Sequence, residues 1–262
     1  MKKSISCIVL CFLAVMAMAQ SVQESPVRLR VATYNVGHFN QGRLGGFQGE
    51  RANIEAMRWR EWIGQQGLDI LGVNEWNKNF DKDSTIDATQ ELLKPYYNNT
   101  YFGERHTWIY NGIATNYQLT NIRQKYWAGD YYAVIGDLKI GNRVITVMST
   151  HIPWQKDWHA AALDSFLVEL KKYKYLICMG DINALDAEQF RFQEQGLNIA
   201  NGGYQGWFCT APTGRALGKK DGINIDNIIT SRNIKIMTIS APFTTLNDRD
   251  HLPVLAELVI TD

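Results

Sequence analysis

Long hydrophobic runs are almost absent from this sequence, and beyond its first residues no stretch is long and apolar enough to span a membrane. Ile8 to Met18 is a short apolar run, below the ~20 residues that spanning requires. Lys2 and Lys3 precede it, and Ala17-Met18-Ala19 gives a small-x-small cleavage pattern. These features predict a signal peptide over residues 1–19, with an uncleaved membrane anchor as the alternative. We therefore expect an exported protein, periplasmic or extracellular, without stable membrane insertion.

A surplus of positive charge is also lacking. The chain has 27 Lys and Arg against 26 Asp and Glu, and removing Lys2 and Lys3 with the signal peptide leaves 25 against 26, a net charge of −1. Proteins that bind nucleic acid nonspecifically usually neutralise phosphates with a basic surplus. The near-neutral charge therefore disfavours a general nuclease, although a local basic patch remains compatible with it.

Cysteines and linkers are scarce. Cys7 and Cys11 would leave with the signal peptide, and nothing in the sequence indicates that the remaining Cys178 and Cys209 meet, so we expect two separate thiols. No Pro/Ser-rich linker, charge block or low-complexity tract divides the rest of the chain, and no short repeat is visible. We expect a single domain over residues 20–262, and a monomer.

Hydrophobic periodicity predicts a mixture of strands and helices. The expected strands cover residues 27–36, 68–73, 112–115, 131–140, 143–150, 175–179, 225–230, 234–240 and 254–260. The expected helices cover residues 51–66 and 160–173. Hairpins and crossovers together predict an α/β layered sandwich with mixed sheets. Polar clusters repeatedly follow an apolar strand, a place where the strand fixes a side chain and the loop exposes it.

The most informative cluster is Gly180-Asp181-Ile182-Asn183, directly after an apolar strand. A spacing of two in an extended chain puts the side chains of Asp181 and Asn183 on the same side. The carboxylate can accept a proton from water, and the carboxamide can hold phosphate oxygens. The alternative is an ordinary turn, where Asp and Asn are common.

Two histidines stand at similar positions. His251 follows Asp250 just before an apolar strand, and His151 follows Thr150 at the end of another. A histidine beside a carboxylate can hydrogen-bond phosphate or move a proton. Each has a plainer alternative, a surface loop pair for Asp250 and His251 and a merely hydrogen-bonded ring for His151.

Three further residues are weak signals alone. Glu75 follows a buried strand and offers the hard oxygen ligand that Mg²⁺ needs. Asn35 ends the first strand, where it can also simply start a turn. Asp226 enters an apolar strand, where a buried carboxylate needs a partner such as a histidine, whereas an exposed strand-start acid does not.

Taken in order, the chain reads Y-N, E after a buried strand, T-H, G-D-x-N-A, I-D-x-I and D-H-x-P from about Val31 to Val254. This series resembles the endonuclease/exonuclease/phosphatase superfamily, the deoxyribonuclease I-like proteins. Gly180 to Ala184 and Asp250 to Val254 are its most specific pieces. The resemblance implies a four-layer α/β sandwich, in which two packed mixed β-sheets are flanked by helices.

The same resemblance implies a divalent metal, Mg²⁺ or Mn²⁺, held by Glu75 with Asn35 and Asp250 near it. One departure concerns this metal site. In abasic-site endonucleases, which this chain resembles, the first strand is followed by the pattern Asn-x-Asp. This sequence has Asn35-Val36-Gly37-His38 there, without an acid. His38 is either part of an Asn-x-x-His variant, which resembles bacterial secreted members, or an ordinary loop histidine.

The catalytic roles implied by the resemblance fall on five residues. Asp181 would orient or deprotonate the attacking water with Asn183 beside it, and Asp226 would pair with His251. Both His151 and His251 would contact the scissile phosphate.

Substrate specificity is expected from loops over residues 37–49, 76–82, 153–158 and 202–220. Within them Trp154, Trp158 and Trp207 either stack on a base, sugar ring or lipid headgroup or pack at the rim. Basic side chains in the last loop either hold an extra phosphate or are simply solvated, and these are Arg215, Lys219 and Lys220.

The sequence therefore predicts an exported metal-dependent phosphoesterase that hydrolyses a phosphodiester or phosphomonoester by in-line attack of an activated water. The substrate would be a phosphorylated small molecule, a lipid headgroup or a nucleic acid. A secreted endonuclease acting on DNA or RNA is one alternative, and a catalytically inactive binding module with the same fold is another.

Overall fold

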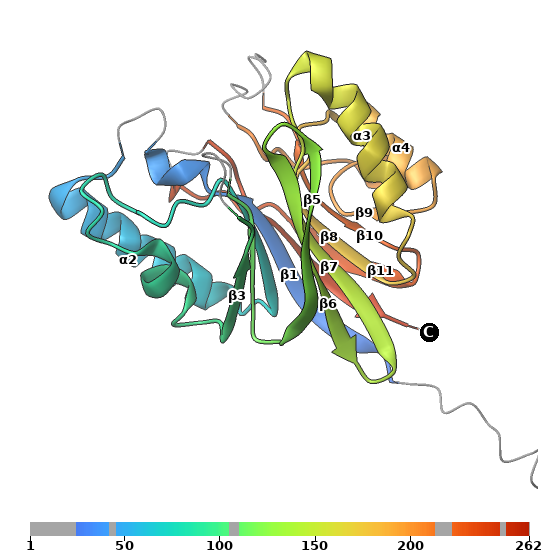
Figure 1. The fold of residues 1–262 in the computed structure, drawn as a ribbon, viewed down its shortest axis with the longest axis horizontal. Helices are drawn as coiled ribbons and strands as arrows, with labels where there is room; N and C mark the ends of the chain where they lie inside the picture. Colours follow the sequence, from blue (N-terminus) through green and yellow to red (C-terminus); the bar gives the residue numbers. More distant parts are fainter. Residues whose placement is uncertain (1–24, 42–45, 105–109, 213–221, 247–249, 262) are drawn as a thin grey trace, which may run out of the picture.

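A computed structural model describes the chain over residues 25–41, 46–104, 110–212, 222–246 and 250–261 (Figure 1). The predicted signal peptide lies outside these residues, as do Arg215, Lys219 and Lys220. No helix within the described ranges has the length and apolar character needed to cross a bilayer.

The described residues contain two six-stranded mixed sheets. The first has the order β11-β12-β1-β2-β4-β3, with the bounds β1 (Val27–Asn35), β2 (Ile70–Asn74), β3 (Asn99–Phe102), β4 (Gly112–Thr115), β11 (Ile234–Ser240) and β12 (Val254–Ile260). The second has the order β5-β6-β7-β8-β10-β9, with the bounds β5 (Leu119–Ala128), β6 (Tyr131–Ile140), β7 (Arg143–His151), β8 (Leu176–Asp181), β9 (Asn198–Ile199) and β10 (Asp226–Thr230).

Helices lie on the two outer faces of this pair of sheets (Figure 1). The long helices are α2 (Gly49–Gln66), α3 (Lys156–Leu170) and α4 (Asp186–Glu194), and the short helical turns are η1 (Gly37–Asn40), η2 (Thr89–Leu93) and η3 (Gly203–Gln205). Helix α2 ends at Gly67, whose φ of 55° is the left-handed conformation that glycine adopts readily. Figure 1 shows α2 outside the first sheet and α3 and α4 outside the second.

The core has three main parts that follow these layers. Apolar side chains from the facing sides of the two sheets, such as Val31, Val147 and Ile177, fill the centre. A second cluster joins α2 to the first sheet through Trp59, and a third joins α3 to the second sheet through Phe166. Helix, sheet, sheet and helix therefore form four layers, and the predicted α/β sandwich is confirmed.

Several predicted elements differ from the structure. The helix predicted over residues 160–173 begins earlier, at Lys156, and ends at Leu170. In the predicted loop over residues 37–49, the described residues include η1, and Phe39 and Phe47 are buried. The strand β5 and helix α4 were not predicted, since β5 is an edge strand whose side chains are mostly exposed or half-buried and α4 is mostly polar.

Strand register brings the polar ends of the two sheets together. The parallel pair β1 and β2 aligns Asn35 with Asn74, and the parallel pair β7 and β8 aligns His151 with Asp181. The antiparallel β10 starts opposite the same place, because Asp226 is aligned with Asp181. Side chains far apart in sequence therefore emerge at one end of the sandwich.

Candidate active site

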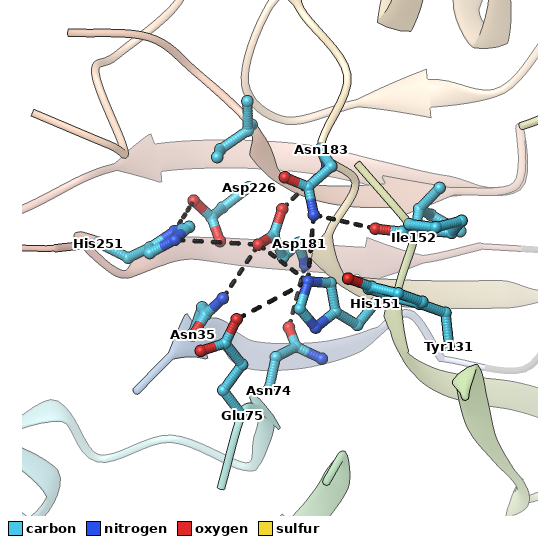
Figure 2. A network of polar contacts seen from close by, with 12 residues as sticks. Asn35, Asn74, Glu75, Tyr131, His151, Ile152, Asp181, Asn183, Asp226 and His251 are labelled. Carbon is cyan, nitrogen blue, oxygen red and sulfur yellow. Dashed lines mark hydrogen bonds and ion pairs between the residues drawn. The ribbon is translucent and has the colours of Figure 1, made fainter. Parts of the chain in front are cut away.

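The candidate active site is a polar cluster at these strand ends, where side chains from both sheets point toward Asp181 (Figure 2). The buried members are Asn35, Asn74, His151, Asp181, Asn183, Asp226 and His251. Glu75 joins them from the end of β2, and 17% of its side-chain surface is exposed. The carboxylates of Glu75 and Asp181 both approach His151 Nε2, at 4.0 and 3.4 Å.

Asp181 is the centre of the cluster. Its Oδ2 accepts a hydrogen bond from Asn35 Nδ2 at 3.0 Å, and its Oδ1 accepts the backbone N–H of Asn183 at 2.9 Å. Burial raises the pKa of the Asp181 carboxyl well above its usual value, and the negative charge of Asp226 raises it further. A carboxylate with a raised pKa is a stronger base once it is ionised.

Asn74 joins the two sheets directly beneath this carboxylate. Its Oδ1 accepts the backbone N–H of Asp181 at 3.0 Å, while its Nδ2 donates to the carbonyl oxygen of Thr150 at 2.8 Å and to Asn111 Oδ1 at 3.0 Å. Asn111 in turn donates to the carbonyl oxygen of Tyr132 at 2.8 Å. Because the Asn74 amide is fully buried and hydrogen-bonded, it fixes the position of the Asp181 backbone relative to β2.

His251 and Asp226 form the histidine–carboxylate pair that was expected from the sequence. His251 Nδ1 lies 2.9 Å from Asp226 Oδ2, and its other nitrogen, Nε2, lies 3.9 Å from Asp181 Oδ2. Burial alone would lower the pKa of His251, but the charge and hydrogen bond of Asp226 outweigh it, and the pKa is raised well above its usual value. The ring is therefore an imidazolium at neutral pH.

The backbone around this pair is also held. Thr210 Oγ1 accepts the backbone N–H of Asp226 at 3.1 Å, and the carbonyl oxygen of Thr210 accepts the N–H of Leu252 at 2.6 Å. One residue thus ties the start of β10 to the segment that carries His251. The Oδ1 atom of Asp226 is buried and has no hydrogen-bond partner among the residues that the structure describes.

His151 has different surroundings. The Nδ2 atom of Asn183 donates to the carbonyl oxygen of Ile152 at 2.9 Å and lies 3.1 Å from His151 Nε2. The Tyr131 ring packs edge-on against the imidazole, with ring centroids 5.1 Å apart. Burial lowers the pKa of His151 to about 4 despite the nearby charge of Glu75. The ring is therefore neutral at neutral pH, and its Nδ1 atom is buried without a hydrogen-bond partner among the described residues.

Glu75 is an ionised carboxylate on the more open side of the cluster. Burial would raise its pKa, but the hydrogen bond from His38 and the charges of His38 and His151 lower the pKa to about 2. His38 Nε2 lies 3.0 Å from Glu75 Oε2. Asp250 borders the same region, because a Cβ on Gly37 would lie 3.6 Å from Asp250 Oδ2.

Two groups of side chains offer ligand atoms for a cation. The ligand atoms of Asp181, Asp226 and His251 lie within 4.8 Å of one another. Asp226 and His251 are hydrogen-bonded to each other there, and all three residues are nearly inaccessible. Glu75 is ionised and partly exposed, so it is the better candidate for an ion that keeps water and substrate oxygens among its ligands.

Two residues that contact the site were missed in the sequence, Asn74 and Tyr131. The hairpin between β6 and β7 aligns Ala133 with Thr150, so its register brings the start of β6, where Tyr131 lies, to the end of β7, where His151 lies. The Gly141-Asn142 turn could have given this register, since turn position fixes pairing in a hairpin. Asn74 offers no comparable signal, because its role depends on how the two sheets pack.

The expected specificity loops are only partly available to a substrate. In the loop over residues 76–82 Trp76 is buried, with 1% of its surface exposed. Trp154, Trp158 and Trp207 are 51%, 43% and 48% exposed, so about half of each indole remains open to a ligand. Trp154 precedes Gln155, whose Nε2 donates to the hydroxyl of Tyr131 at 3.0 Å, next to His151. Cys178 and Cys209 are free thiols.

Comparison with known proteins gives the same fold. The endonuclease/exonuclease/phosphatase protein from Bacteroides vulgatus has a TM-score of 0.69 at 16% identity, over 89% of this chain and 99% of its own. ANGEL2, a 2′,3′-cyclic phosphatase solved with adenosine-2′,3′-vanadate, has a TM-score of 0.67 at 13% identity, over 91% and 97%. Truncated TDP2 from Caenorhabditis elegans has a TM-score of 0.63 at 16% identity, over 88% and 97%.

No curated protein sequence matches the chain. The model of the endonuclease/exonuclease/phosphatase family, however, matches residues 32–242, which include the ends of β1, β2, β7 and β8 and the start of β10. The match therefore covers most of the candidate site as well as most of the fold. The chain belongs to the endonuclease/exonuclease/phosphatase family, whose members hydrolyse phosphoesters.

Proposed function

We propose that this chain is an exported, divalent-metal-dependent phosphoester hydrolase in which water attacks the phosphorus in line with the leaving oxygen. One observation carries the proposal. Two carboxylates in different environments, Glu75 and Asp181, approach the same nitrogen of His151, and Asp181 also approaches the charged His251, at one end of the sandwich. Phosphoester hydrolysis needs a cation ligand, a base for water and a positive group for the phosphoryl oxygens.

The donor set fits a divalent cation. Glu75 offers an ionised carboxylate, Asn35 lies beside it, and Asp250, which lies near Gly37, could add a further oxygen donor. Mg²⁺ and Mn²⁺ both accept such oxygen ligands and leave positions for water and phosphate. When bound, the cation would supply positive charge against the substrate phosphate.

The side chains around Asp181 suit the remaining steps. Asp181 accepts a proton from the attacking water, since its raised pKa makes the carboxylate basic. Asn35 and the Asn183 backbone fix both of its oxygens, so the base does not rotate away. His251, held as an imidazolium by Asp226, donates hydrogen bonds to the phosphoryl oxygens and stabilises the charge that develops on them.

The neutral His151 and Asn183 complete the opposite wall. Asn183 has a φ of 51°, a left-handed conformation that asparagine adopts more easily than most residues. In this conformation its amide hydrogens face Ile152 and His151. His151 and Asn183 are thus held by each other and by the backbone, and they line this wall without adding a second full charge.

Substrate class is the finer part of the proposal. We favour an exported small molecule, lipid headgroup or sugar phosphate over nucleic acid, because the chain has no basic surplus. The half-exposed Trp154 and Trp207 provide flat apolar surfaces for such a group. A secreted nuclease is the second candidate, supported by structural similarity to TDP2 and ANGEL2, of which the latter was solved with an adenosine nucleotide analogue.

The test is a phosphoester panel with Mg²⁺, Mn²⁺ or EDTA. Bis-p-nitrophenyl phosphate, p-nitrophenyl phosphate, sphingomyelin and supercoiled plasmid separate the substrate classes. We expect turnover that requires metal and falls ~10²–10⁴-fold in Asp181→Asn, the range of a positioned acid–base group. Asp164→Asn is the matched control, since Asp164 is exposed and pairs with Arg191 away from the site.

Two outcomes would remove the proposal. Equal turnover by Asp181→Asn and the wild type would show that Asp181 is not the base. No turnover of any phosphoester with either metal, by a folded chain, would favour the inactive binding module.

Export is proposed from the N-terminal pattern alone. Cell fractionation and mass spectrometry of the recovered N-terminus test it directly. We expect the chain outside the cytoplasm, beginning near Gln20. Recovery in the cytoplasm with Met1 retained would contradict this part without affecting the enzymatic part.

A further inference from the structure

The turn that follows β1 has an unusual backbone. Gly37, His38, Phe39 and Asn40 have φ angles of 54°, 53°, 55° and 62°, so four successive residues are left-handed. Glycine adopts this conformation freely, but each of the other three is strained, at a cost of roughly 1–3 kcal/mol per residue. Such a turn persists only where the surrounding structure holds it.

Aromatic packing holds the turn from below. The Phe39 side chain is fully buried, and its ring centroid lies 5.3 Å from that of Trp59, 4.9 Å from that of Trp76 and 4.8 Å from that of Phe80. Phe39 therefore anchors the strained segment in the core between α2 and the first sheet. The residue before it, His38, is left facing the polar end of the strands.

Glu75 meets His38 in the same conformation. Glu75 has a φ of 52°, and its carbonyl oxygen accepts the backbone N–H of His38 at 2.9 Å. The two side chains meet as well, with 3.0 Å between His38 Nε2 and Glu75 Oε2. Two left-handed residues, joined by main chain and side chain, thus place an imidazole nitrogen beside the Glu75 carboxylate.

His38 and Glu75 are also the more accessible pair. Their side chains are 12% and 17% exposed, whereas those of His151 and His251 are 2% and 5% exposed. The Nε2 atom of His38 itself is buried, so an ion entering from solvent would approach this pair from the side of the partly exposed Glu75. Ligands bonded at about 2.1 Å and at right angles to one ion lie about 3 Å apart, which matches the observed separation.

We propose that His38 is a nitrogen ligand of the cation held by Glu75, and that it makes the site prefer Mn²⁺ over Mg²⁺. The inference rests on the divalent cation of the proposed function and specifies its identity. Mg²⁺ prefers oxygen ligands, whereas an imidazole nitrogen suits first-row transition ions. The strained turn has a direct use under this assignment, because it delivers that nitrogen to the carboxylate.

Equilibrium binding of the ions alone tests the assignment without any substrate. Free Mn²⁺ is measured by electron paramagnetic resonance on the mature chain, and Mg²⁺ affinity is measured by competition. The variant is His38→Gln, which keeps a hydrogen-bond donor for Glu75 but removes the imidazole. We expect its affinity for Mn²⁺ to fall about 10–100-fold, as for loss of a group that supports a metal site, while its affinity for Mg²⁺ changes less than about threefold.

His159→Gln is the matched control. His159 also faces a glutamate, with 3.4 Å between its Nε2 and Glu188 Oε1, but it lies on α3 away from the site. The His159→Gln variant should leave the affinities for Mn²⁺ and Mg²⁺ unchanged. If His38→Gln weakens both ions equally, His38 only positions Glu75, and the proposal is overturned. Unchanged affinities for both ions overturn it as well.

A second measurement needs no variant. Electron spin-echo spectroscopy of Mn²⁺ bound to the wild-type chain should show modulation from a directly bonded ¹⁴N nucleus. Absence of ¹⁴N coupling would overturn the proposal even if His38→Gln failed to fold. Both readouts are separate from the proposed function, which is tested by phosphoester turnover and by the Asp181→Asn variant.

Discussion

His151 and His251 lie on the two sides of Asp181 and are equally buried, with 2% and 5% of their surfaces exposed. Their pKa values nevertheless shift in opposite directions. His151 faces the Asn183 amide and the Tyr131 ring, and burial lowers its pKa to about 4. His251 faces the Asp226 carboxylate, which raises its pKa despite the same burial.

Since both rings are buried, the Asp226 carboxylate bonded to His251 accounts for the difference in their charge. The carboxylates near His151, Asp181 at 3.4 Å and Glu75 at 4.0 Å, do not offset its desolvation, whereas the hydrogen bond and charge of Asp226 do so for His251. The site thereby has one cationic donor and one neutral group on either side of a single base. For an anionic substrate, this arrangement concentrates positive charge on the His251 side of Asp181.

The largest expected effect comes from making His251 resemble His151. Asp226→Asn replaces the carboxylate by an amide of the same shape, so the pKa of His251 should fall by roughly 1–3 units. Turnover of the phosphoester identified in the panel should fall about 10²–10⁴-fold at neutral pH. Asp164→Asn is the control, and wild-type turnover by Asp226→Asn would contradict the role of a cationic His251.

Acid stability separates the two histidines next. The unfolded chain protonates His151 near its usual pKa of 6.5, whereas the folded chain does so at about 4. Between these values the unfolded state binds more protons, so lowering the pH destabilises the fold by roughly 3 kcal/mol through this residue. Above pH 6.5 the contribution vanishes, and below pH 4 it levels off. The raised pKa of His251 acts with the opposite sign, since protonation favours its folded state.

Denaturant titration at several pH values measures this contribution. When the pH is lowered from 6.5 to 4, the free energy of unfolding should decrease less in His151→Gln than in the wild type. His159→Gln controls for the loss of an imidazole outside the cluster. Parallel pH curves for His151→Gln and the wild type would show that His151 is not held neutral.

The converse exchange makes His151 resemble His251. Asn183→Asp puts a carboxylate 3.1 Å from His151 Nε2, at a left-handed position that aspartate also tolerates. The pKa of His151 should rise by roughly 1–3 units, as expected for an adjacent opposite charge. Titration of the ring by NMR measures the shift. A pKa that stays near 4 would mean that the surroundings of His151, rather than its partner, fix its charge.

The smallest expected effect comes from Asn74, which joins the sheet of His251 to that of His151. Asn74→Leu leaves the N–H of Asp181 and the carbonyl of Thr150 without this partner. Each buried unsatisfied group costs about 1–3 kcal/mol, so the free energy of unfolding should decrease by that order. Thermal and denaturant unfolding measure it, with Asn198→Leu at the far end of the second sheet as a comparison. No loss of stability would mean that the sheets do not depend on this amide.

Much of the fold could be predicted from the sequence because apolar strands and polar strand ends leave a clear pattern. The residues 112–115, 131–140, 234–240 and 254–260 were predicted with the observed strand bounds. The hydrophobic pattern did not reveal β5, whose side chains are mostly exposed or half-buried and where Asn121 and Gln124 stand among apolar residues. It also failed at Phe39, because a left-handed turn anchored by a buried ring depends on the aromatic side chains around it.

The membership of the site was similarly visible, since Asp181, Asn183 and His251 stand directly at strand boundaries. The contacts and charges of these side chains could not be predicted from the sequence. The charge of His151 depends on Tyr131 and Asn183 and on complete burial, and sequence spacing gives none of these. The bridging role of Asn74 likewise requires the packed sheets, because its three hydrogen bonds reach residues on β8, on β7 and just before β4.

That one buried histidine is charged and the other neutral is tested most directly by NMR titration of the ring nitrogens of the wild-type chain, assigned with His151→Gln. We expect the His251 ring to remain protonated well above pH 6.5 and the His151 ring to remain neutral down to about pH 4. Titration of both rings together near pH 6.5 would contradict the assignment of a cationic and a neutral side to the site.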